Sequence, residues 1–87
     1  MTVYMVERNL KGIAMEDLGA AQRAAITTAE SMRGDGAEIR YMHSAFVPGD
    51  GRCMCFFDGE SAEQVKDLND RAGLPYDRVS EALDLRP

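Results

Sequence analysis

Hydrophobic positions follow two different periods along the chain, one typical of strands and one typical of helices. Residues 3–8 alternate loosely between apolar and polar and are rich in β-branched and aromatic side chains, which predicts a strand. Residues 15–33 place apolar side chains at helical spacing, with acidic residues in the first turn and Arg33 in the last. This pattern predicts a helix that ends at Gly34, because glycine readily adopts the left-handed conformation that caps a helix C-terminus. The predicted apolar stripe consists of Leu18, Ala21, Ala25, Ala29 and Met32.

A second strand and a third are predicted by residues 37–47 and 52–58, which are both extended in pattern. The loop between them, residues 48–51, reads Pro-Gly-Asp-Gly and combines a fixed φ with residues that tolerate positive φ. Such a loop between two extended runs predicts a β-hairpin. Strict alternation places His43 on the same side of its strand as Tyr41.

The register of this hairpin decides which side chains share a face. A four-residue loop pairs Val47 with Arg52 and puts His43 on the face opposite to Cys53 and Cys55, whereas a loop of three or five residues reverses that arrangement. The sequence leaves both possibilities open.

The end of the chain predicts a second helix and a last strand. Residues 61–64 read Ser-Ala-Glu-Gln, which has the form of a capping box, and the helix that follows stops at Gly73. Residues 77–85 place Val79, Leu83 and Leu85 on one face and predict a strand. The apolar stripe of the helix consists of Ala62, Val65, Leu68 and Ala72.

The predicted order β-α-β-β-α-β is that of a ferredoxin-like α+β fold, with a four-stranded antiparallel sheet and two helices on one face. Residues 1–87 form a single domain without repeats or linkers. A chain of 87 residues has a small core. The sheet face without helices is either exposed to solvent or buried against a partner. We therefore expect a homodimer of the dimeric α+β-barrel type.

Composition and charge narrow the classes of partner. Ten basic residues stand against fifteen acidic ones, a net charge of −5, and the basic residues form no stripe that would neutralise phosphates. We expect no nucleic-acid partner. No long apolar stretch is present, which argues against an export signal or a membrane span and favours the cytoplasm.

Cys53 and Cys55 are poorly placed to close a disulfide on each other, and two thiols are too few for an iron–sulfur cluster.

His43 is the single histidine and lies within the second strand, close to several sulfur-bearing residues. Imidazole, thiolate and thioether are the donors that nickel, Cu(I) and zinc prefer. The alternative is that these side chains only pack, since free cysteine and methionine are ordinary core residues. The sulfur-bearing neighbours are Met42, Cys53, Met54 and Cys55.

Glu7 ends the first strand, which the topology places at the sheet centre. It could ligate a metal or accept a proton, or it could form an ion pair with Arg8 or Arg78. Glu81 is a weaker candidate of the same type. No nucleophile-and-base arrangement, glycine-rich phosphate loop or His-Glu-x-x-His motif is present, so no catalytic residue is assigned. Candidates for lining a cleft are Tyr4, Tyr41, Ser44 and Cys53.

Four segments in order resemble a family of small bacterial proteins that is catalogued as a domain of unknown function and has a nickel-binding characterised member. The segments are residues 4–8 (Tyr-Met-Val-Glu-Arg), 41–47 (Tyr-Met-His-Ser-Ala-Phe-Val), 54–57 (Met-Cys-Phe-Phe) and 71–81 (Arg-Ala-Gly-Leu-Pro-Tyr-Asp-Arg-Val-Ser-Glu). They span nearly the whole chain.

The resemblance implies a ferredoxin-like fold, a homodimer formed through the sheets, and nickel or another divalent transition metal near the dimer centre. The matching positions are Glu7, His43, Ser44 and Cys55, of which the metal ligands would be His43, Glu7 and Cys55. Many members carry tryptophan where Tyr41 stands and a second histidine where this chain has Leu68, and Cys53 is an additional thiol.

Two hypotheses of function follow, and metal binding is preferred to catalysis. In the first, His43, Glu7 and Cys55 bind the metal in each subunit of a dimer. In the second, the protein is a cofactor-free dimeric α+β-barrel enzyme, similar to isomerases or monooxygenases, in which His43 or Glu7 moves a proton on a small organic molecule. An apolar cavity that contains His43 would favour the enzyme, and His43 at the dimer surface would favour the metal. A structural dimer without either activity is the third possibility.

Overall fold

The computed structural model describes all residues from 1 to 87 and has the predicted order of elements. The strands are β1 (Thr2–Asn9), β2 (Arg40–Val47), β3 (Arg52–Gly59) and β4 (Arg78–Ala82), and the helices are α1 (Met15–Gly34) and α2 (Ala62–Arg71). The strands form one antiparallel sheet in the order β2-β3-β1-β4. The fold is thus the ferredoxin-like α+β arrangement.

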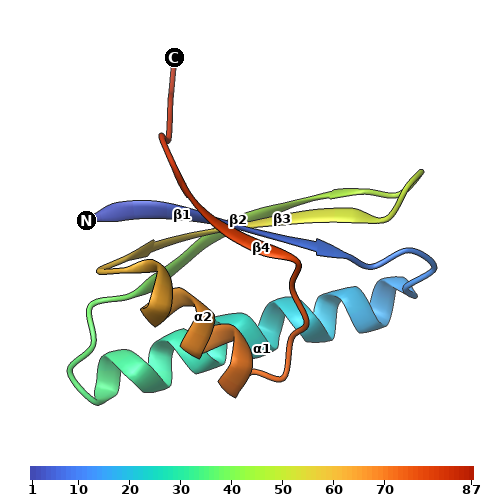
Figure 1. Ribbon diagram of the computed structural model, residues 1–87. Helices are drawn as coiled ribbons and strands as arrows, with labels where there is room; N and C mark the ends of the chain where they lie inside the picture. The colour runs from blue at the N-terminus through green and yellow to red at the C-terminus, as the bar shows by residue number, and fades with distance from the viewer.

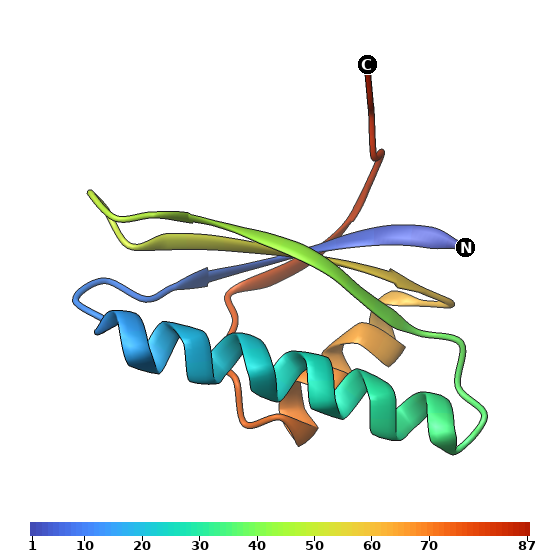
Figure 2. The ribbon, with the colours of Figure 1, turned by 180° about the vertical axis from the view of Figure 1, so that it is seen from behind.

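Both helices lie on the same side of the sheet. Figure 1 shows α1 and α2 below the four strands, and Figure 2 shows from behind that α1 runs along the whole underside. The other side carries no element of secondary structure, and the C-terminal segment after β4 rises away from it (Figure 1). We call these two sides the covered face and the open face.

The hairpin between β2 and β3 has the four-residue loop, because Val47 pairs with Arg52. The register then shifts between Tyr41 and His43, which are matched to the adjacent residues Phe57 and Phe56. A β-bulge inserts one extra residue, here Met42, and flips the side chains beyond it to the other face. The prediction that His43 and Tyr41 share a side was therefore wrong.

Element ends differ from the predictions in three places. Gly34 is the last residue of α1, and the glycine with positive φ is Gly36 (φ 95°). Residues 37–39 precede β2 because the strand begins at Arg40. Leu83 and Leu85 lie beyond β4 and are highly exposed rather than on a strand face.

The start of α2 follows its predicted cap. The Ser61 side chain accepts a hydrogen bond from the Gln64 backbone N–H at 3.1 Å, as a capping serine does. The Gln64 side chain accepts in turn from the backbone N–H of Glu60 at 2.8 Å, one residue earlier than the standard capping box. Gly73 has φ 71° and stops the helix as predicted.

The core lies between the covered face and the helices. Its largest fully buried side chains are Phe57, Ile39, Leu68, Val6, Val65 and Asn69. Only 15 of the 87 residues are buried, so the core of the single chain is thin. No helix is long and apolar enough to cross a membrane.

Candidate functional site

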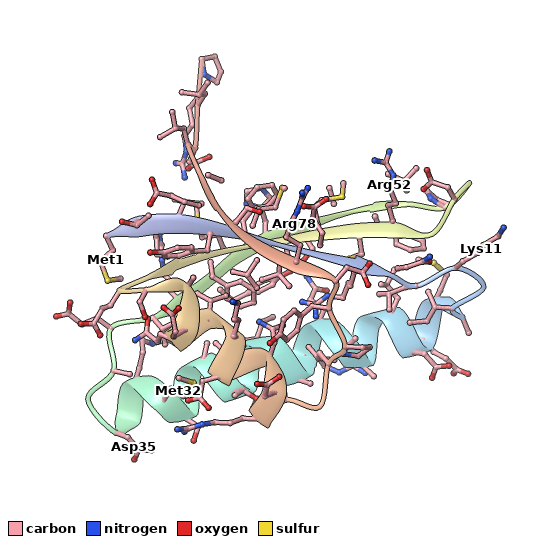
Figure 3. All side chains as sticks on the ribbon, viewed as in Figure 1. Met1, Lys11, Met32, Asp35, Arg52 and Arg78 are labelled. Carbon is pink, nitrogen blue, oxygen red and sulfur yellow. The ribbon has the colours of Figure 1, made fainter.

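Alternation along the strands sends the candidate residues to two different faces. On β1, Tyr4, Val6 and Arg8 are buried toward the helices, so the residues between them point to the open face. The register extends this assignment to the neighbouring strands. Apolar and ligand-type side chains of the open face include Val3, Met5, Glu7, His43, Ala45, Val47, Met54 and Phe56, and its margins carry Arg40, Asp58, Ser80 and Ala82. Figure 3 shows Arg52 and Arg78 rising from the same side.

His43 lies on the open face near the edge of the sheet and is exposed. Its ring stacks on that of Phe56, its cross-strand neighbour, with centroids 4.8 Å apart and planes at 23°. This contact orients the imidazole against the Phe56 ring, while the exposed side chain remains accessible to a ligand.

Glu7 is half-buried on the open face, two strands away from His43. Its Oε2 accepts from Arg78 Nε at 2.8 Å and lies 2.6 Å from Arg78 Nη2. Of the two ion-pair partners considered from the sequence, Arg78 is the one observed. Because the Arg78 side chain is 69% exposed, it can move away from Glu7 at small cost.

Cys53 and Cys55 lie on the covered face, where both are buried. Their Sγ atoms are 3.9 Å apart. Burial, reinforced by the nearby Cys55, raises the pKa of the Cys53 thiol to about 11. Cys53 is therefore a neutral thiol at pH 7, in a state that neither attacks electrophiles nor binds metals readily.

One side chain of α1 and three on the covered face form a continuous hydrogen-bonded chain. Gln22 Nε2 donates to the Tyr41 hydroxyl at 3.1 Å, Tyr41 and Ser44 share a bond of 2.7 Å, and Ser44 Oγ donates to Cys55 Sγ at 3.0 Å. Since Ser44 donates to the thiol, the proton between the two hydroxyls comes from Tyr41. The chain is thus directed from α1 to Cys55.

The structure therefore brings His43 and Glu7 to one face and places Cys55 on the other. No group of three or more His, Cys, Asp or Glu side chains within the chain is arranged to hold a metal ion. Leu68, which the resemblance set against a histidine of other family members, is fully buried in the core. Glu81 is exposed on β4, opposite Tyr4.

A cavity of about 150 Å³ lies between α1 and the covered face. Of the four residues expected to line a cleft, Tyr41, Ser44 and Cys53 do so, whereas Tyr4 does not. Nine of the twelve lining residues are hydrophobic, as the enzyme hypothesis expects. His43, however, projects from the opposite side of the sheet, so the cavity lacks the group that was to move a proton.

Arg8 is a buried cavity residue that was not predicted from the sequence, because it was considered only as a surface partner for Glu7. It is 4% exposed and lines the cavity. Its Nη2 donates to Asn69 Oδ1 at 2.9 Å, and its Nη1 donates to the Pro75 carbonyl at 3.1 Å. The alternation of Tyr4, Val6 and Arg8 contained the signal, since it places Arg8 on the buried side.

Comparison with known proteins identifies relatives of the chain. No curated protein sequence matches it. The crystal structure of SCO4226 from Streptomyces coelicolor A3(2) has the same fold, with a TM-score of 0.79 and 23% sequence identity over 98% of this chain and 99% of that one. The family described as "Nickel responsive protein SCO4226-like" matches residues 4–82, which is most of the chain. The chain belongs to this SCO4226-like family of nickel responsive proteins.

Proposed function

We propose that the protein is a small cytoplasmic homodimer that binds nickel or another divalent transition metal between its subunits, with His43 and Glu7 as ligands. The observation that carries the proposal is that both side chains project from the one face of the sheet that no helix covers. The family to which the chain belongs is described by its response to nickel, which favours this metal.

The chemistry of the open face supports its burial against a second copy. A sheet face that meets water usually carries polar side chains, yet the centre of this face is apolar. Its apolar residues are Val3, Met5, Ala45, Val47, Met54 and Phe56. Leu83 and Leu85 are 80% and 86% exposed on the segment that rises on this side, where a second copy would give them a surface to contact.

A second copy also supplies the ligands that one chain lacks. His43 and Glu7 lie two strands apart, and within one chain no third His, Cys, Asp or Glu side chain joins them to complete a metal site. A two-fold axis through the open face duplicates both residues and can bring His43 of one chain toward Glu7 of another. An imidazole nitrogen and a carboxylate oxygen, with the thioethers of Met5 and Met54 nearby, suit a borderline metal such as nickel.

The proposal omits Cys55 because a ligand on the covered face cannot reach a metal held between two open faces. Its thiol lies behind the sheet and accepts a hydrogen bond from Ser44 at 3.0 Å. Cys55 and Ser44 are then part of the hydrogen-bonded chain beneath α1 rather than of the metal site.

Calorimetric titration of metal-free protein with Ni²⁺ tests the proposal, with His43→Ala and Cys55→Ala as a matched pair. We expect His43→Ala to weaken nickel binding at least 10-fold and Cys55→Ala to leave it within about 2-fold, because a lost ligand typically costs more than 1.4 kcal/mol. No heat with wild-type protein near micromolar metal, or an equal loss in both variants, would contradict it.

The dimer is tested separately by sedimentation, using the same substitution on the two sides of the molecule. Ala45→Lys places a charge on the open face, whereas Ala20→Lys places it on the exposed surface of α1. We expect the first to give a monomer and the second to remain dimeric, because an unpaired charge is costly in a buried apolar interface. Identical association of the two variants would locate the interface elsewhere.

A further inference from the structure

The covered face holds a feature that metal binding does not use, namely a buried cation beside a cavity. The Arg8 guanidinium lines the space beneath α1 and is buried. None of the five ion pairs of the molecule includes it. A buried charge without a counterion is unfavourable, so such groups are normally paired.

The neighbours of Arg8 orient the guanidinium without neutralising it. Both hydrogen-bond acceptors, Asn69 Oδ1 and the Pro75 carbonyl, are uncharged. Asn69 is itself fully buried and fixed by a bond of 2.8 Å from its Nδ2 to the Val65 carbonyl. These two bonds engage two of the five N–H groups of the guanidinium, whose planar fork matches a carboxylate.

Cys53 is the acidic group beside Arg8 in the cavity wall, but it does not provide the missing negative charge. Burial raises the pKa of this thiol to about 11, even though the nearby Arg8 acts in the opposite direction. At neutral pH the thiol is uncharged, and Arg8 has no anion in the structure.

The remainder of the cavity is suited to an apolar body. Leu18, Ala21 and Ala25 face it from α1, and Phe46 faces it from β2. The hydroxyl protons of Tyr41 and Ser44 are already used within the chain that ends at Cys55. Arg8 is therefore the group in this wall that is free to recognise a charge.

We propose that this cavity binds a small organic monocarboxylate whose carboxylate pairs with Arg8 and whose apolar body lies between α1 and the sheet. A volume of about 150 Å³ suits a body the size of one aromatic ring, since engineered apolar cavities of that size bind benzene. The site is on the opposite side of the sheet from His43 and Glu7, so it stands independently of the metal site.

Titration of ¹⁵N-labelled protein with benzoate, followed by NMR, tests the proposal, with benzamide as a neutral probe of the same shape. We expect benzoate to bind with a Kd of about 1 mM or tighter and to shift amides of α1 and β1, and benzamide to bind at least 10-fold more weakly. Equal binding of the two probes would exclude recognition of charge by Arg8. Equal binding of inorganic phosphate and benzoate would exclude the apolar part of the site.

Two variants test separately the charge of Arg8 and the volume of the cavity. Arg8→Gln removes the cation and should abolish the preference for benzoate over benzamide. Ala21→Leu fills the cavity from the helix while leaving Arg8 and its partners in place, and should weaken binding of benzoate at least 10-fold. If Arg8→Gln fails to fold, the test rests on Ala21→Leu alone. If Ala21→Leu binds benzoate as tightly as the wild type does, benzoate lies outside the cavity and the proposal is overturned.

Discussion

The two faces of the sheet present different side chains to a ligand. The covered face is closed by α1 and α2, yet it contains a buried Arg8, two thiols and a cavity. The open face is apolar at its centre but carries exposed His43 and half-buried Glu7, and no helix covers it. Because neighbouring residues on a strand point to opposite faces, the same four strands can support two separate sites.

Because the two faces are separate, residues that are adjacent in sequence do not belong to one site here. His43 and Ser44 are consecutive, but the first stacks on Phe56 and the second donates to Cys55 behind the sheet. The resemblance to the family grouped His43, Ser44 and Cys55 together. The register separates them into a face for the proposed metal and a face for the proposed carboxylate.

The largest expected effect comes from truncating two neighbouring phenylalanines on β3. Phe57 is fully buried on the covered face, so Phe57→Ala should lower the free energy of unfolding by about 3–5 kcal/mol. Phe56 points to the open face, so Phe56→Ala should cost about 1 kcal/mol or less in dilute protein, where dimers are few. Urea unfolding at two protein concentrations measures both, and equal costs in dilute protein would mean that the faces are not distinct.

A smaller effect is expected at the hairpin loop that fixes the register. Gly51 has φ 79°, and a Cβ there would collide with the backbone of Lys11, so Gly51→Ala should destabilise the fold by roughly 2–4 kcal/mol. Gly49, in the same loop, has open space around it, and Gly49→Ala should change stability by about 0.5 kcal/mol or less. Thermal unfolding of the pair checks this, and similar losses would show that the approach of Lys11 does not require glycine at position 51.

The smallest expected effect is a dependence of stability on alkaline pH that arises on the covered face. Cys53 keeps its proton up to about pH 11 in the folded protein, whereas its ordinary pKa is 9.0. Between these values the unfolded chain binds fewer protons than the folded one, so the free energy of unfolding falls as the pH rises. In Cys53→Ala, the free energy of unfolding measured with urea should fall less steeply between pH 9 and 11. A pH dependence equal to that of the wild type would contradict a raised pKa for Cys53.

Most of the fold could be predicted from the sequence because its signals are local. The apolar stripe of α1, the cap formed by Ser61 and the turn residues between β2 and β3 each depend on residues close in the chain, although the length of the hairpin loop stayed open. The bulge at Met42 could not be predicted in this way. A bulge adds one residue to one strand, and an alternating pattern reads the same on either side of it.

The sites were harder to predict because they depend on distant contacts. Arg8 was taken for a surface charge, and its burial rests on Asn69 and Pro75, which are 61 and 67 residues away in sequence. Glu7 and His43 were named as candidate ligands, but the face on which His43 lies depended on the register that the sequence left open. The assignment of ligands to a metal stays a prediction.

Native mass spectrometry of metal-free protein titrated with Ni²⁺ tests whether the metal lies between two subunits, because it reports subunits and metal ions in the same particle. We expect nickel on the dimer and not on the monomer, and we expect both the dimer and its nickel to be lost in Ala45→Lys. A monomer that holds nickel, or a His43→Ala dimer that retains it, would contradict a metal site built between two open faces.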